Sequence, residues 1–139
     1  MYNKILLAVD GSDHSVRAAK EAVKVAGANP GAQITIVYVA DYDDAKNDVL
    51  HSGSSAELDL QRRKKIQPVE EAIAAGNIKY RVEILRGTPG PAIVDYANEE
   101  HFDILVIGSR GLNAVQEMVL GSVSHKVVKR ANCPVLIVK

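Results

Sequence analysis

Five apolar runs of strand length divide the chain. The runs are KILLAV (4–9), QITIVYV (33–39), KYRVEIL (79–85), DILVIG (103–108) and PVLIVK (134–139). Four of them are almost continuous in valine, isoleucine and leucine, which is typical of strands buried on both faces of a parallel sheet. In the third, Tyr80, Val82 and Ile84 alternate with charged residues. We therefore expect the third strand to be buried on one face and to lie at an edge.

Amphipathic patterns of helical period separate the runs, and they cover residues 13–27, 56–75, 89–100 and 122–131. Ser12 or Asp13 can cap the first of these helices, and Thr88 followed by a proline can begin the third. The second contains Pro68, which removes a backbone donor and clashes with the preceding turn. We therefore expect a kink or break near residues 64–68.

Strands and helices thus alternate along the chain, which predicts one open, five-stranded parallel α/β sheet with helices on both faces. Residues 1–139 form a single domain in this interpretation, because no linker or repeat divides them. The polar segment 41–55, DYDDAKNDVLHSGSS, is expected to be a mobile surface loop.

The composition narrows the function by exclusion. The 17 basic and 17 acidic residues balance, so charge alone predicts neither nucleic-acid binding nor attachment to a membrane surface. The N-terminal apolar run is too short for a signal peptide or a membrane span, and we expect a cytosolic protein. Cys133 is the only cysteine, which excludes an internal disulfide and favours a small core residue over a nucleophile.

A ligand site is expected where crossovers leave the sheet toward opposite faces. If the first strand is central and the fourth lies beside it, VDGSD (9–13) and GSRGLNA (108–114) meet at that crevice. Gly121-Ser122 precedes a helix, whose N-terminal N–H groups favour a phosphate. Asp10 would repel phosphates, so a ribose hydroxyl, a base amine or a magnesium ion suits it better. The alternative is purely structural: Gly108 and Gly111 form a turn, and Ser122 is an N-cap.

The residues that carry these features resemble the universal stress protein family over nearly the whole chain. KILLAVDGSDHS is similar to the family's opening strand and acidic turn, and SVSHKVVKRANCPVLIVK to its closing helix and strand. The segment GSRGLNAVQEMVLGS fits the family's ATP-binding pattern G-x2-G-x9-G-[S/T] at Gly108, Gly111, Gly121 and Ser122.

The resemblance implies a Rossmann-like fold of the adenine nucleotide alpha hydrolase type, with strand order 3-2-1-4-5. It also implies an ATP site (AMP or ADP in its place, with or without magnesium) and a homodimer formed through residues 134–138. It places adenine near Ala8, Val9, Asp10 (also near the ribose) and Val39, the nucleotide along Ile107, Gly108, Arg110 and Gly111, and the phosphates around Gly121, Ser122, Val123 and Ser124. The guanidinium of Arg110 either pairs with a phosphate or is solvated.

These features favour a cytoplasmic, ATP-binding regulatory module of the stress response, with slow or incidental hydrolysis and a protein partner left open. Hydrolysis needs a positioned water and a base, and His125, in the first turn of the last helix, suits packing or solvation better than catalysis. Two alternatives stay open: a small nucleotide-dependent hydrolase or phosphoryl or adenylyl transferase, and a ligand-free dimeric interaction module.

Overall fold

The computed structural model describes residues 2–40, 55–110 and 121–139. Within them the elements occur close to where the sequence predicts them. They are β1 (Lys4–Val9), α1 (Asp13–Gly27), β2 (Gln33–Ala40), α3 (Ser55–Ala75), β3 (Lys79–Arg86), α4 (Pro89–Glu99), β4 (Ile104–Gly108), α5 (Ser122–Arg130) and β5 (Val135–Val138). The predicted loop 41–55 lies outside the described residues, except for Ser55, which begins α3.

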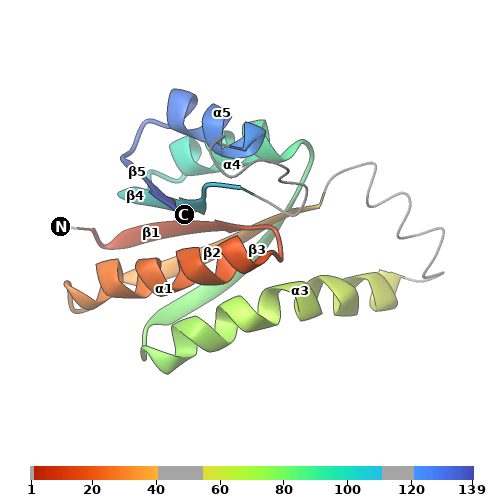
Figure 1. Ribbon diagram of the computed structural model, residues 1–139, viewed down its shortest axis with the longest axis horizontal. Helices are drawn as coiled ribbons and strands as arrows, with labels where there is room; N and C mark the ends of the chain where they lie inside the picture. Colours follow the sequence, from red (N-terminus) through yellow and green to blue (C-terminus); the bar gives the residue numbers. More distant parts are fainter. Residues whose placement is uncertain (1, 41–54, 111–120) are drawn as a thin grey trace.

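The strands form one parallel sheet in the order β3-β2-β1-β4-β5, which confirms the expected fold class and strand order. Helices α1 and α3 cover one face, and α4 and α5 cover the other (Figure 1). In the register of the sheet, Ala8 of β1 pairs with Val37 of β2 and with Ile107 of β4. The carboxyl ends of the three central strands therefore reach the same edge.

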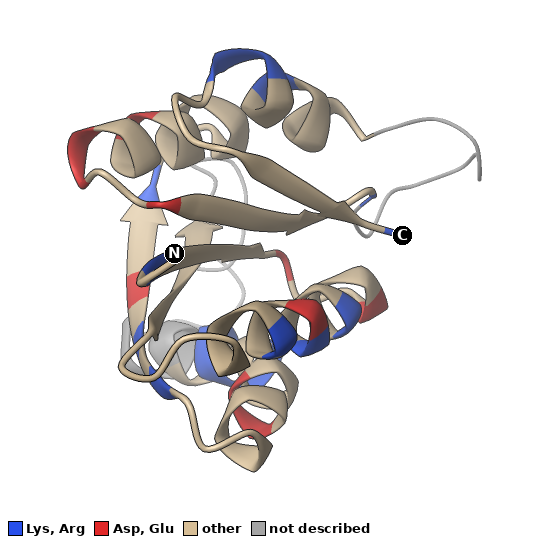
Figure 2. Cartoon of the chain, turned by 90° about the vertical axis from the view of Figure 1, so that its left-hand side faces the viewer, with Lys and Arg blue, Asp and Glu red and all other residues tan. Residues whose placement is uncertain are grey.

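The central strand β1 is buried on both faces. Its alternate side chains point to opposite sides: Ile5 and Leu7 pack in the cluster under α1 and α3, whereas Leu6 and Ala8 pack in the cluster under α4 and α5. Charged residues lie mainly on the helices and at the ends of the inner strands (Figure 2). The apolar pattern of β1 is continuous because both faces of the strand are buried, as the sequence predicts.

The two edge strands are less buried than their patterns predict. On β3, Tyr80 and Ile84 are 38% and 39% exposed, so the alternation does not produce one fully buried face. Val135 and Ile137 of β5 are only half-buried, although the sequence predicted burial on both faces. The reason is position: an edge strand has a neighbouring strand on one side only, and its helices cover it incompletely.

Of the kink or break expected near Pro68 in the second helix, the break is wrong. Helix α3 continues from Ser55 to Ala75 with Pro68 inside it. Pro68 is exposed, whereas Ile66 and Val69 beside it are buried against the sheet. Burial of this apolar face offsets the backbone hydrogen bond that the proline cannot make, because packing rather than local propensity supplies most helix stability in proteins.

Two further side chains near the C-terminus refine the expected core. Val128, which fits the helical period of residues 122–131, is 49% exposed, whereas its neighbour Val127 is fully buried. Cys133 is half-buried against the cluster under α4 and α5, and burial raises the pKa of its thiol. A raised pKa lowers the thiolate fraction and therefore the reactivity of the group.

None of the helices in the described part of the chain is long and apolar enough to span a membrane.

Candidate functional site

The predicted site residues gather at the carboxyl edge of the sheet, between β1 and β4. Ala8 and Val9 are buried at the end of β1, and Ile107 is buried beside Ala8 in β4. Val39, half-buried, lies near the end of β2. From this edge the chain leaves β1 toward α1 on one face and β4 toward α5 on the other (Figure 1). Open α/β sheets bind their ligands at such a switch point.

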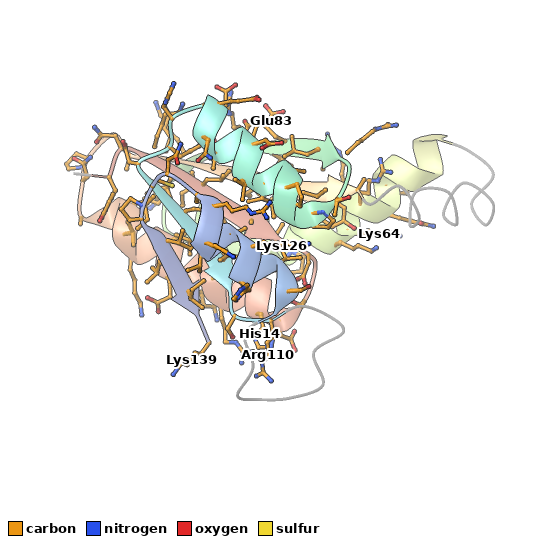
Figure 3. All side chains as sticks on the ribbon, turned by 90° about the horizontal axis from the view of Figure 1, so that it is seen from above. His14, Lys64, Glu83, Arg110, Lys126 and Lys139 are labelled. Carbon is orange, nitrogen blue, oxygen red and sulfur yellow. The ribbon has the colours of Figure 1, made fainter. Side chains whose placement is uncertain are left out.

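Gly108 ends β4 where the first turn of α1 packs against it. A Cβ atom added at Gly108 would lie 2.9 Å from the Cβ of His14 and 3.3 Å from its carbonyl oxygen. Figure 3 shows the labelled side chains of His14 and Arg110 at this same edge of the molecule. The glycine therefore has a structural role, because it lets α1 approach the strand closely.

The two ends of the glycine-rich segment are held together by hydrogen bonds. The Ser124 hydroxyl donates to the Gly108 carbonyl oxygen at 2.6 Å, and the Gly121 N–H donates to the Ser109 carbonyl oxygen at 2.7 Å. The Ser109 N–H in turn donates to Val138 of β5 at 2.8 Å. These bonds bring the start of α5 to the end of β4, as the binding hypothesis requires. Gly111 and the rest of 111–120 lie outside the described residues.

The N-terminus of α5 has the donor chemistry of an anion site. Gly121 is its N-cap residue, and no side chain among the described residues caps it. Ser122 is exposed, Val123 is half-buried and Ser124 is 3% exposed. The first N–H groups of a helix have no partner inside the helix, and the helix dipole favours negative charge there. This end of the helix therefore suits a phosphate.

Asp10 lies across the switch point, directly after β1, and its carboxylate is held by the first turn of α1. Its Oδ1 atom accepts hydrogen bonds from the Ser12 N–H at 2.9 Å, the Ser12 hydroxyl at 2.6 Å and the Ser15 hydroxyl at 2.8 Å. From the sequence, Ser12 was expected only as a helix cap, and no role was expected for Ser15. The spacing D-x-S-x-x-S was the available signal, because Asp and Ser side chains commonly bond to groups a few residues away.

Two further charged or titratable residues, Arg110 and His125, lie near the expected ligand site. Arg110 is half-buried and lies two residues beyond the end of β4. It is therefore near the carboxyl edge of the sheet, where the ligand site is expected. His125 is exposed in the first turn of α5, and its N–H donates to Gly121 as part of the helix. Of the two roles that the sequence favoured for His125, packing and solvation, its exposure agrees with solvation.

Proteins of one known family match this chain along its whole length. The model of the universal stress protein family matches residues 1–139. The chain belongs to the universal stress protein family. A universal stress protein of Thermus aquaticus is 40% identical over 141 residues, covering 100% of each chain. The fold and family implied by the resemblance are thus confirmed.

Two solved structures have the same architecture as this chain. The hypothetical protein MJ0577 superposes with a TM-score of 0.84 at 28% identity, covering 100% of this chain and 96% of that one. A universal stress protein in complex with cAMP superposes with a TM-score of 0.72 at 26% identity, covering 99% of this chain and 97% of that one. An adenine nucleotide is therefore a ligand of at least one protein with this fold in the family.

Proposed function

We propose that this universal stress protein binds ATP at the carboxyl edge between β1 and β4 and acts as a nucleotide-dependent regulatory module of the stress response. The adenine would lie near Val39 and the ends of β1 and β2, the ribose near Asp10, and the phosphates at the start of α5. AMP or ADP could occupy the same site, with or without magnesium.

One observation carries the proposal: the start of α5 is tied to the end of β4, opposite Asp10. The Gly121 N–H and the Ser124 hydroxyl make these ties. An anion site and a carboxylate thus face the same edge from two strands. This combination suits a ligand with phosphates at one end and hydroxyl groups at the other. The structurally similar complex with cAMP supports an adenine nucleotide as that ligand.

Within the proposed site, the described residues divide the phosphate contacts between backbone and side chains. The hydroxyl of Ser124 donates to Gly108, so we assign to Ser124 a backbone contribution. The exposed Ser122 would use both its N–H and its hydroxyl. Arg110, after β4, would add a charge-assisted hydrogen bond to a phosphate oxygen. Gly111 is assigned a backbone contact by the signature alone.

The regulatory interpretation follows from what surrounds the proposed phosphates. Phosphoryl transfer needs a group that positions or deprotonates the nucleophile. One oxygen of the Asp10 carboxylate is already bound by the hydroxyls of Ser12 and Ser15 at the start of α1. We therefore propose that occupancy, rather than turnover, is the output of the site. Steady ATP turnover that is lost in Asp10→Ala would instead support a nucleotide-dependent enzyme.

A ligand analysis tests the binding proposal. The nucleotide carried by the purified protein is identified, and melting temperatures are measured with ATP, ADP, AMP and GTP, with and without magnesium. At a ligand concentration 100 times Kd, binding stabilises the fold by about 2.7 kcal/mol. Gly121→Val should remove this shift. Gly27→Val is the matched control, because a Cβ added at the end of α1 would meet no described atom within 4 Å apart from its chain neighbours and the backbone of its own helix.

We also propose a homodimer formed through β5. Val135, Leu136 and Ile137 are half-buried in the single chain, and β5 is an edge of the sheet. An apolar edge strand with unpaired backbone groups favours pairing with another strand. A second copy related by a two-fold axis would supply that strand and cover the apolar side chains. If the protein is instead a ligand-free interaction module, this dimer should form, but no nucleotide should raise the melting temperature.

A further inference from the structure

The Asp10 carboxylate accepts three hydrogen bonds at the start of α1, and all three end on one oxygen. The Ser12 N–H, the Ser12 hydroxyl and the Ser15 hydroxyl each donate to Oδ1. Ser15 is linked to Asp10 a second time, because its hydroxyl oxygen accepts the Asp10 N–H at 2.9 Å. The side chain and the backbone of Asp10 are therefore tied to the same helix turn.

Burial distinguishes the two sides of this cluster. Ser12 and Ser15 are buried at 7% and 3% exposure, whereas Asp10 is half-buried. Because the two oxygens of a carboxylate point in different directions, fixing Oδ1 toward the buried serines turns Oδ2 away from them. None of the three hydrogen bonds uses Oδ2. Among the described residues Oδ2 accepts no hydrogen bond, so it is available as an acceptor.

The Ser12 hydroxyl binds Asp10 instead of capping α1. Ser12 occupies the N-cap position of α1, yet among the described residues no side chain makes a capping hydrogen bond to this helix. Its hydroxyl donates backward to Asp10 instead. A serine cap is typically worth about 1 kcal/mol of helix stability. A departure from the locally most stable arrangement is expected mainly at functional sites.

We propose that Ser12 and Ser15 are positioning residues that aim the Oδ2 atom of Asp10 at a ribose hydroxyl. This inference rests on the proposed nucleotide site and adds a basis for sugar recognition. An ionised carboxylate oxygen can only accept, so it selects a hydrogen-bond donor. A sugar hydroxyl is such a donor, and a deoxy sugar lacks it. The serines act through Asp10 and do not themselves contact the nucleotide.

Binding of ribose and deoxyribose nucleotides to the full chain tests the inference. Calorimetry gives Kd for ATP, 2′-deoxy-ATP and 3′-deoxy-ATP. The wild-type protein should bind one deoxy analogue about tenfold more weakly than ATP, as expected for loss of a hydrogen bond to a charged acceptor. Ser15→Ala and Ser12→Ala should reduce this preference to about twofold or less.

Two further variants separate positioning from stability. Thr35→Val is the matched control. It removes a buried hydroxyl in β2 that accepts a hydrogen bond from Arg81 of β3. It should keep the sugar preference. Ser12→Thr retains a hydroxyl and should keep the preference as well. If Ser15→Ala does not fold, the comparison of Ser12→Ala with Ser12→Thr decides the question.

The outcomes distinguish this inference from the proposed function. If the wild-type protein binds ATP and both deoxy analogues equally, or if the alanine variants keep the wild-type preference, the positioning role is wrong and the nucleotide site stands. If the wild-type protein binds no adenine nucleotide, the proposed function fails and the positioning role fails with it. A preference that is lost only in the alanine variants supports both.

Discussion

At Gly108, the absence of a side chain decides how closely α1 approaches β4. The sequence suggested either a turn or close approach of a ligand at this glycine, and the structure adds a third reason. A Cβ there would lie 2.9 Å from the His14 Cβ, closer than such atoms normally approach. The contact joins the end of one strand to the start of a helix on the other side of the proposed site.

Gly108→Ala is therefore expected to destabilise the fold. The added methyl group forces α1 outward, and overpacking of this kind costs about 1–3 kcal/mol. Chemical denaturation without nucleotide measures the change. Gly27→Ala is the control: with open space around the added Cβ, it should be neutral or stabilise by up to about 1 kcal/mol. Equal effects of the two substitutions would contradict the packing argument.

Asp103 at the opposite end of the sheet predicts a pH dependence. Its carboxylate accepts the backbone N–H groups of Lys4 and Asn3 at 2.9 and 3.0 Å, and these bonds, with that of Lys4 first, lower the pKa of Asp103. A carboxyl whose pKa is lowered by folding contributes stability above its pKa in the unfolded chain, which is about 3.9. That contribution is lost as pH falls through the lower, folded value.

Asp103→Asn should therefore cost stability at pH 7 and little at pH 3. Asp103 is exposed, so solvent screening keeps the loss below about 1 kcal/mol. Urea unfolding at pH 7, 5 and 3 measures it. Asp95→Asn, an exposed carboxylate on α4, should run parallel to the wild-type protein at all three values. A gap between Asp103→Asn and wild type that widens on acidification would refute the assignment.

Among the elements, α5 depends on its connection to β4. The helix spans only nine residues, too few to be stable alone. Its place is set by Val127 in the core and by the Ser124 hydroxyl on the Gly108 carbonyl. The element that would hold the phosphates is thus anchored by a residue of its own first turn.

Ser124→Ala should separate anchoring from binding. It leaves the Gly108 carbonyl without its partner, and a buried polar group in that state costs about 1–3 kcal/mol. Ser122→Ala, at an exposed position two residues away, should change stability by less than about 0.5 kcal/mol. It should instead weaken ATP binding. Thermal melts with and without ATP measure both effects, and a reversed order would contradict the division of roles.

Helix α3 tolerates Pro68 at a cost that substitution should reveal. An interior proline destabilises a helix by about 3 kcal/mol relative to alanine, and Pro68 is exposed. Pro68→Ala should therefore stabilise the fold by about 1–3 kcal/mol in urea unfolding. Pro91→Ala is the control, because the N–H groups in the first turn of α4 have no partner inside the helix. No gain at Pro68 would indicate that α3 has adapted fully to the proline.

At the scale of the whole molecule, the proposed dimer depends on the outward-facing backbone groups of β5. The Leu105 N–H donates to Pro134 and the Ser109 N–H donates to Val138, so these β5 carbonyls face β4. Backbone groups alternate in direction along a strand, and the N–H of Ile137 therefore faces outward. A second strand would pair there.

Ile137→Pro should give monomers, whereas Ile137→Ala should keep the dimer. Both substitutions shorten the same half-buried side chain, but only proline removes the outward N–H. Sedimentation equilibrium measures the mass of each variant. If the wild-type protein sediments as a monomer, or if the two variants associate equally, pairing through β5 is wrong.

Much of the fold could be predicted from local pattern. Apolar runs located the strands, and Thr88-Pro89 located the start of α4 because caps act over a few residues. Pattern failed where neighbours distant in sequence decide the outcome. Val128 fits the helical period but faces solvent, and Pro68 lies in a helix that packing preserves. The strand order came from the family resemblance, since periodicity carries no information about which strands pair.

The sequence by itself determined the elements, the glycine signature and the residue types at the proposed site. It left three possible ligand groups for Asp10: a ribose hydroxyl, a base amine and a magnesium ion. Only the tertiary structure shows that one carboxylate oxygen is already bound by Ser12 and Ser15. Likewise, only the fold brings Gly108 against His14 and Gly121 against Ser109. The physical reason is range: propensity and capping act within a helical turn, whereas close approach and burial depend on residues that the sheet brings together.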